Sequence, residues 1–191
     1  MSLVGVIILG GKNTRMGGEK KAFLKYKDKC FYEHILNSMR KVDKIYLSVE
    51  DKSLYENLDY ELIEDIHKEI GPIGGLYSIF KNCKEDAFLV LPSDVPLIND
   101  IVVNELIETY KKSNKPVVLI DNKDYPNPLI AIYTRDCMEV VEKMIENKNY
   151  KMKNILSSID YDTVKYKDLC LDEKFINDCN DKVTYEKLIK E

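Results

Sequence analysis

Residues 4–21 read VGVIILGGKNTRMGGEKK, a short apolar run that leads directly into a glycine-rich, basic loop. The run from Val4 to Leu9 is apolar on both faces of an extended chain, which is typical of a fully buried strand. The glycine pairs Gly10-Gly11 and Gly17-Gly18 let backbone N–H groups approach a ligand closely. Arg15 and Lys21 add the two kinds of cation that usually bind phosphate. These features predict a buried strand followed by an anion-binding loop.

The spacing in this loop excludes two well-known phosphate-binding motifs. A P-loop has the spacing G-x-x-x-x-G-K-[ST], but the fifth residue after Gly10 is Arg15 and the fifth after Gly11 is Met16. The dinucleotide-binding motif needs G-x-G-x-x-G, and the sequence contains no G-x-G. A flexible, charged surface loop is the alternative interpretation, although glycine pairs directly after a buried strand are destabilising unless they serve a function.

The rest of the chain alternates short β-branched runs with longer amphipathic stretches. Strands are expected at residues 44–49, 60–64, 87–91, 116–120, 128–133 and 163–166, and helices at 31–42, 74–81, 101–110, 137–145 and 183–190. This alternation predicts an α/β fold with a mostly parallel central sheet and helices on both faces. Ligands of such sheets bind at the carboxyl ends of the strands, so the loops after Leu9, Glu64 and Leu91 are the expected site.

Composition limits the possible classes of protein. The 191 residues suit one domain, spanning residues 1–191, and the net charge of −4 (29 Lys and Arg against 33 Asp and Glu) disfavours nucleic-acid binding. The five cysteines are odd in number and form no C-x-x-C pair, which argues against a disulfide framework or a zinc site. No signal peptide or membrane-spanning run is present, so a cytoplasmic protein without a membrane partner is expected.

The glycine-rich loop resembles the signature G-G-x-S-x-R-M-G…K of the nucleotidyltransferase superfamily, with Asn13 in place of the serine. Within the superfamily, the motifs are most similar to those of the molybdenum cofactor guanylyltransferases. The resemblance extends over residues 4 to about 180. Its further motifs, in order along the chain, are Ile63–Asp65, Gly71–Leu76, Phe88–Pro96, Pro128–Ala131 and Phe175–Asn177.

This resemblance implies a Rossmann-like core that transfers GMP from GTP to the terminal phosphate of molybdopterin cofactor and releases pyrophosphate. It implies Mg²⁺ as cofactor, and GTP, the molybdopterin cofactor and molybdoenzyme maturation proteins as partners. By position, Ile8, Leu9 and Gly10 are expected to bind the nucleotide through their backbone, together with Gly11. Lys21 is expected to contact phosphate, Asp65 to lie near the guanine or the ribose, and Asp94 to bind the metal ion. The family has an asparagine where this chain has Ser48.

The chemistry gives independent reasons for three of these residues, each with a structural alternative. Asp94 follows a buried strand, where a carboxylate suits Mg²⁺, although Ser-Asp is also ordinary turn sequence. Asp65 could accept hydrogen bonds from guanine N1–H and the N2 amine, or cap the following turn. Arg15 could bind pyrophosphate or form a surface ion pair. Sequence alone does not distinguish Lys20 from Lys21, and the family spacing selects Lys21.

Two other functions fit parts of the pattern. A related Mg²⁺-dependent enzyme could use another nucleotide or acceptor, as would a cytidylyltransferase acting on the same cofactor or on a sugar or alcohol phosphate. Asp65 argues for guanine here, because cytosine offers only one amine donor. The chain could instead be a non-catalytic, nucleotide-binding maturation factor for molybdoenzymes. The presence of Arg15, Lys21 and Asp94 together argues against a loss of catalysis.

Overall fold

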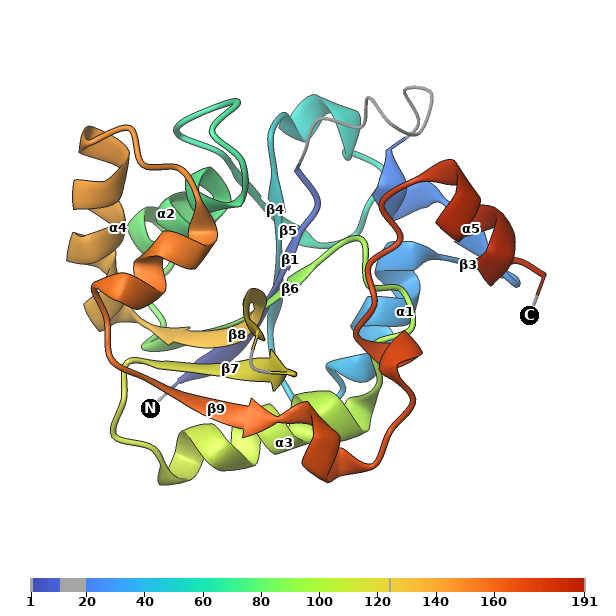
Figure 1. Ribbon diagram of the computed structural model, residues 1–191. Coiled ribbons are helices and arrows are strands. Elements are labelled where there is room, and N and C mark those ends of the chain that lie inside the picture. The colour runs from blue at the N-terminus through green and yellow to red at the C-terminus, as the bar shows by residue number, and fades with distance from the viewer. Residues whose placement is uncertain (1, 11–19, 124, 191) are drawn as a thin grey trace.

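A computed structural model describes residues 2–10, 20–123 and 125–190, and its centre is a seven-stranded sheet (Figure 1). The strands lie in the order β5-β4-β1-β6-β8-β7-β9. Their bounds are β1 Leu3–Ile8, β4 Ile45–Val49, β5 Glu61–Glu64, β6 Ala87–Pro92, β7 Val117–Asn122, β8 Tyr125–Thr134 and β9 Tyr161–Lys165. Only β8 runs antiparallel to its neighbours β6 and β7, so the mostly parallel sheet expected from the sequence is confirmed.

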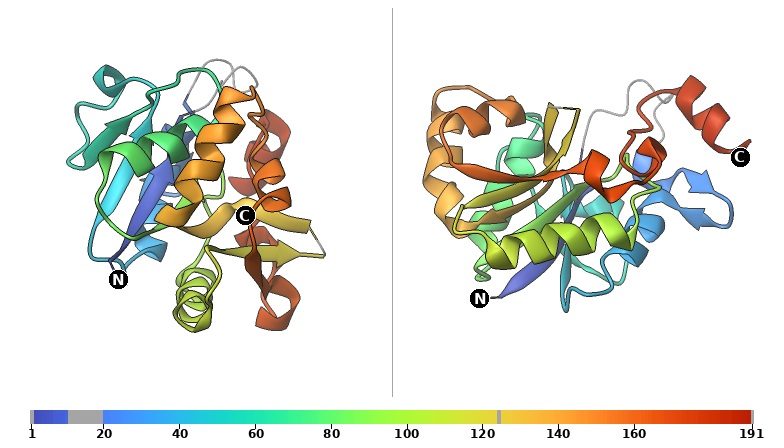
Figure 2. Two further views of the ribbon diagram at one scale, coloured as in Figure 1. Left: turned by 90° about the vertical axis from the view of Figure 1, so that its left-hand side faces the viewer. Right: turned by 60° about the horizontal axis from the view of Figure 1, so that its bottom comes forward.

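Helices cover both faces of this sheet. Helices α1 (Phe31–Ser38) and α3 (Asp100–Lys112) lie on one face, and α2 (Pro72–Asn82) and α4 (Met138–Glu146) lie on the other (Figure 1). After β9 the chain leads away from α2 and α4 to α5 (Lys182–Leu188), as Figure 2 also shows. There, the Tyr185 hydroxyl donates a hydrogen bond to the carbonyl of Lys25, which lies in the two-stranded hairpin β2 (Lys25–Tyr26) and β3 (Lys29–Cys30).

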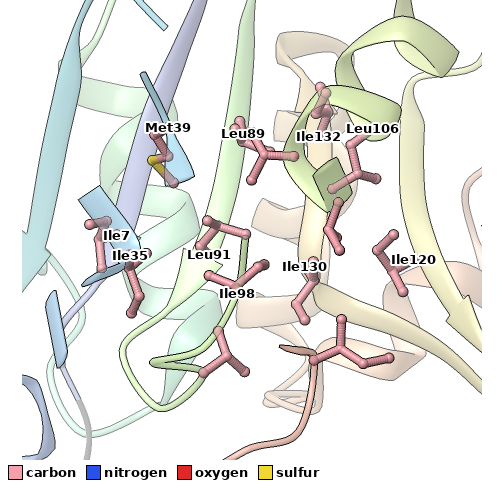
Figure 3. Close-up of a cluster of buried hydrophobic side chains, with 14 of the residues drawn as sticks. Ile7, Ile35, Met39, Leu89, Leu91, Ile98, Leu106, Ile120, Ile130 and Ile132 are labelled. Carbon is pink, nitrogen blue, oxygen red and sulfur yellow. The ribbon is translucent and has the colours of Figure 1, made fainter. Parts of the chain in front are cut away.

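The two-residue alternation of the strands divides the core into two layers. Ile7 of β1 packs into the layer that contains α1 and α3, and Val6 and Ile8 pack into the layer that contains α2 and α4. Figure 3 shows the first layer, which contains Ile35 of α1 and Met39, the residue directly after the end of that helix. These side chains are fully buried, and such burial contributes on the order of 2 kcal/mol per residue to folding.

The order of strands brings the chain segments of the site together. The neighbours of β1 are β4 on one side and β6 on the other, so the direction of winding reverses at β1. In register, Ile8 lies beside Ser48 and Pro92, and Val49 lies beside Glu64. The segments that follow β5, β4, β1 and β6 therefore emerge at the same edge of the sheet, where ligands of α/β proteins bind.

The structure differs from the sequence-based expectation in two places. The helix expected over 31–42 ends at Ser38, and residues 39–42 form tighter turns in which the Met39 and Val42 amides donate to carbonyls three residues earlier. The β2–β3 hairpin was not predicted because each strand has only two residues and periodicity needs a longer run. Within the described residues, no helix is long and apolar enough to cross a membrane.

Candidate active site

A pocket of about 290 Å³ opens at the carboxyl ends of β1, β4 and β5. Three residues with carboxylate side chains line it, namely Glu50, Asp65 and Glu69. The other lining residues belong to the end of β1 and to the start of α2. The lining residues are Ile8, Gly10, Glu50, Asp65, Glu69, Gly71 and Pro72. An acidic pocket of this kind favours a ligand that presents hydrogen-bond donors, such as the N–H groups of a base or the hydroxyls of a sugar.

Asp65 is held at the inner side of this pocket by the neighbouring strand. Its amide donates to the carbonyl of Val49 over 2.9 Å, and its Oδ1 accepts a hydrogen bond of 3.2 Å from the Ser48 hydroxyl. Burial raises the pKa of Asp65 to about 6, and the negative charges of Glu50 and Glu64 add to this effect, while the Ser48 hydrogen bond opposes it. Above that pH, Asp65 offers acceptors in a place where few water molecules compete for them.

Two glycines let the start of α2 approach this carboxylate. Gly71 has a φ of +77°, which favours glycine, and Pro72 then begins the helix with its fixed φ. Within the helix, a Cβ at Gly75 would lie 2.5 Å from Ser48 Oγ and 3.5 Å from Asp65 Oδ1. Gly75 therefore allows α2 to pack closely on the ends of β4 and β5.

A second group of polar side chains lies at the end of β6. Lys21 Nζ is 3.5 Å from Asp94 Oδ2 and also donates to Oδ1 of Asn180. The backbone of Asp94 is fixed in turn, because its carbonyl accepts a 2.7 Å hydrogen bond from the amide of Cys179. Burial raises the pKa of Asp94; the positive charge of Lys21 opposes this, and Asp178 reinforces it. The C-terminal segment thus packs against the lysine–aspartate pair.

Asp94 fits a magnesium ion that is held mainly by its substrate. Among the described residues, no group of three His, Cys, Asp or Glu side chains could hold a metal ion by itself. Mg²⁺ typically uses one or two carboxylates and takes its remaining ligands from phosphate oxygens and water. A single half-buried carboxylate beside a lysine meets that requirement.

Most of the residues expected from the sequence meet at this edge. Ile8, Gly10 and Asp65 line the pocket, and Lys21 pairs with Asp94. The side chain of Leu9 packs into the core, its amide donates to the Ser48 carbonyl and its carbonyl accepts from the Tyr55 hydroxyl at 3.4 Å. A contact of the Leu9 backbone with the nucleotide stays a prediction. Gly11 and Arg15 lie outside the described residues.

Sequence reasoning missed three residues of this edge. Glu50 and Glu69 line the pocket, and Glu50 could have been noticed as an acidic residue directly after the second long strand. Asn180, which binds Lys21, is 159 residues away in sequence, and no local pattern marks it.

Comparisons with known proteins find relatives of this chain in sequence and in fold. Residues 5–164 match the model of the MobA-like NTP transferase domain. The chain is 32% identical to a probable molybdenum cofactor guanylyltransferase of Clostridium perfringens over 76% of this chain and 73% of that protein. It is 34% identical to one of Thermococcus sibiricus over 78% of each chain. Its fold is similar to that of molybdopterin-guanine dinucleotide biosynthesis protein A from Archaeoglobus fulgidus, with a TM-score of 0.84, 20% identity and coverage of 100% and 97%.

Proposed function

The chain belongs to the MobA-like NTP transferase family and is a nucleotidyltransferase, and from this premise we propose that it transfers GMP from GTP to the terminal phosphate of molybdopterin cofactor, with release of pyrophosphate. We propose further that residues 1–191 act as one nucleotidyltransferase domain. The curated relatives are named as probable molybdenum cofactor guanylyltransferases, which supports this substrate pair.

The observation that carries the proposal is the order of groups along the sheet edge. Asp65 follows β5, and Asp94 with its partner Lys21 lies beyond β6, three strands further across. Neighbouring strands are about 4.8 Å apart, so these ends of the site are separated by about 14 Å, a span suited to a nucleoside triphosphate lying across the edge. The base would then lie at Asp65 and the phosphates at Lys21.

Each residue has a defined part in this proposal. Asp65, when ionised, accepts hydrogen bonds from guanine N1–H and the N2 amine, which together distinguish guanine from cytosine. Lys21 neutralises charge on the phosphates, and Arg15 and Gly11 contribute to the same phosphate loop. Members of the family generally use a divalent metal, and we propose that Asp94 holds Mg²⁺. Bound there, the ion would neutralise the charge that develops as one phosphate attacks another.

The proposal is tested by incubating the purified protein with GTP, Mg²⁺ and molybdopterin cofactor and measuring the guanine dinucleotide product by mass spectrometry. We expect one pyrophosphate per product, and no product when CTP replaces GTP. The variant Asp94→Asn is expected to bind GTP and to transfer GMP at least about 100-fold more slowly, since it loses the carboxylate that would hold Mg²⁺ at the reacting phosphates.

The matched control is Asp168→Asn, which makes the same change at an exposed position away from the pocket. Formation of a cytosine dinucleotide from CTP in place of the guanine product would contradict the proposed nucleotide. Normal transfer by Asp94→Asn would contradict the proposed metal-binding residue.

A further inference from the structure

Glu50 is a carboxylate of the pocket that has no part in the proposed transfer of GMP. It directly follows β4, it is half-buried, and it lines the pocket together with Gly10 and Asp65. A Cβ at Gly10 would lie 3.9 Å from the Cβ of Glu50, so Glu50 and the backbone that follows β1 are close together. Among the described residues, none forms a hydrogen bond or salt bridge with the Glu50 carboxylate, which leaves it available to a ligand.

The strand order gives Glu50 a definite place along a bound nucleotide. From β5 to β6 the edge presents Asp65, then Glu50, then Gly10, and finally Asp94 with Lys21. A nucleotide that lies across the edge presents its base, its sugar and its phosphates in the same order. With the base at Asp65 and the phosphates beyond Gly10, the sugar lies at Glu50.

The chemistry of Glu50 suits a sugar better than a base or a phosphate. A carboxylate accepts hydrogen bonds and repels phosphate, and the two ribose hydroxyls are donors. In dinucleotide-binding α/β folds, an acidic residue beyond the first phosphate-binding loop binds the ribose 2′-hydroxyl in the same way. The Lys20 ammonium lies over the Tyr55 ring and interacts electrostatically with Glu50 and Asp51. Its positive charge therefore offsets part of the local negative charge.

We propose that the Glu50 carboxylate accepts hydrogen bonds from the 2′- and 3′-hydroxyls of the bound nucleotide and makes the site selective for ribonucleotides over 2′-deoxyribonucleotides. This inference rests on the proposed nucleotide site, but it is independent of which base that site selects. It separates the role of Asp65, which contacts the base, from the role of Glu50, which contacts the sugar.

The test is equilibrium binding of GTP and 2′-deoxy-GTP, with Mg²⁺ present, to the wild type and to three variants. The wild type is expected to bind GTP about 10-fold more tightly than 2′-deoxy-GTP, because one hydrogen bond to a charged group is lost. Glu50→Ala is expected to weaken GTP binding about 100-fold, because two hydrogen bonds are lost, and 2′-deoxy-GTP binding about 10-fold, because only the 3′-hydroxyl bond is lost, so that the preference for GTP disappears. Glu50→Gln keeps one acceptor oxygen, so its affinity for GTP should lie between those of the wild type and of Glu50→Ala.

Glu64→Gln is the matched control. Glu64 and Glu50 both raise the pKa of Asp65 through their charge, but Glu64 does not line the pocket. Glu64→Gln therefore removes a negative charge near Asp65, as Glu50→Gln does, but leaves the proposed sugar contact in place. The ratio of its affinities for GTP and 2′-deoxy-GTP should equal that of the wild type. Circular dichroism and thermal unfolding verify that each variant is folded.

The outcomes separate this inference from the proposed function. If Glu50→Ala weakens the binding of GTP and 2′-deoxy-GTP equally, or if the wild type does not discriminate between them, the assignment of Glu50 is wrong. If the wild type binds CTP in place of GTP, the guanylyltransferase proposal fails, and the same comparison with CTP and 2′-deoxy-CTP still decides the role of Glu50. If the wild type binds none of these nucleotides, both proposals are overturned.

Discussion

The Ser48 hydroxyl donates a 3.2 Å hydrogen bond to Oδ1 of Asp65, from one strand end to the next, directly beneath α2. Ser48 is fully buried, so its hydroxyl has few other partners. The Ser48 Oγ lies 2.5 Å from the position that a Cβ on Gly75 would occupy. The orientation of Asp65 therefore depends on a hydroxyl that fits only because residue 75 is a glycine.

Gly75→Ala is expected to destabilise the protein and to weaken GTP binding. The new methyl group would displace Ser48 Oγ, and such overpacking of a buried region typically costs about 1–3 kcal/mol. The gain in helix propensity, about 1 kcal/mol, offsets only part of this. Thermal unfolding and GTP titration measure both effects.

The companion variant is Gly75→Ala combined with Ser48→Ala, which removes the clashing oxygen. We expect it to recover most of the lost stability but not the GTP affinity, because Asp65 still lacks its hydrogen bond. Equal instability of the single and double variants would show that the methyl group meets something other than Ser48.

Asp65→Asn is expected to stabilise the protein above pH 6. Because the pKa of Asp65 is raised from 3.8 to about 6, the folded protein retains a proton that the unfolded chain loses between these values, and stability falls as pH rises through that range. Asparagine carries no charge, so it removes this destabilisation. After allowance for solvent screening, the gain is about 1–2 kcal/mol at pH 7 and vanishes below pH 4. Urea unfolding at several pH values measures it.

GTP binding should respond to pH in the opposite direction. Only the ionised Asp65 accepts from both guanine donors, so wild-type affinity is expected to fall as the pH drops below about 6. Protonation of the nucleotide itself affects every variant, and the difference between the wild type and Asp65→Asn at each pH isolates the contribution of Asp65. A constant difference between pH 5 and pH 8 would contradict the proposed contact with guanine.

Part of this site follows from the sequence because it depends on strand ends. Gly10, Asp65 and Asp94 each follow a recognisable apolar run, and the carboxyl ends of parallel strands meet at one edge. The strand positions and the mostly parallel sheet follow for the same reason. Apolar periodicity is a local property of the sequence, so it can be recognised without knowing the tertiary contacts.

The remaining features depend on contacts that no local pattern records. Sequence alone could not distinguish Lys20 from Lys21, and the structure separates them, with Lys21 beside Asp94 and Lys20 over the Tyr55 ring. Asn180 reaches Lys21 only because the C-terminal segment returns to β6. Leu9, which is expected to contact the nucleotide through its backbone, directs its side chain into the core, because it continues the alternation of β1 one residue beyond the end of the strand.

The separation of the two lysines predicts different effects of replacing them. Lys21→Gln is expected to lower the rate of GMP transfer about 100-fold or more, because it removes a charge beside the reacting phosphates. Lys20→Gln is expected to lower this rate less than about 10-fold, since its ammonium contacts Tyr55 at 3.9 Å and cation–π contacts of this kind are worth about 1 kcal/mol. Lys25→Gln, at an exposed position of β2, is the control. Equal losses of the transfer rate in Lys20→Gln and Lys21→Gln would contradict the different roles of the two lysines.

Tyr55 connects the two segments that flank residues 11–19. Its ring stacks on Phe23 with centroids 5.5 Å apart and contacts the Lys20 ammonium, while its hydroxyl donates to the Leu9 carbonyl at 3.4 Å. Tyr55→Leu is expected to lower the free energy of unfolding by about 2–3 kcal/mol, through loss of buried aromatic surface and of both ring contacts.

Tyr55→Phe separates the contributions of the ring and the hydroxyl. A 3.4 Å hydrogen bond is long, so its loss should lower the free energy of unfolding by less than about 1 kcal/mol, while the ring contacts persist. Urea unfolding of both variants measures the difference, and Tyr60→Leu serves as the control because Tyr60 is 42% exposed. If Tyr55→Phe were as unstable as Tyr55→Leu, the hydroxyl and not the ring would be what joins the two segments.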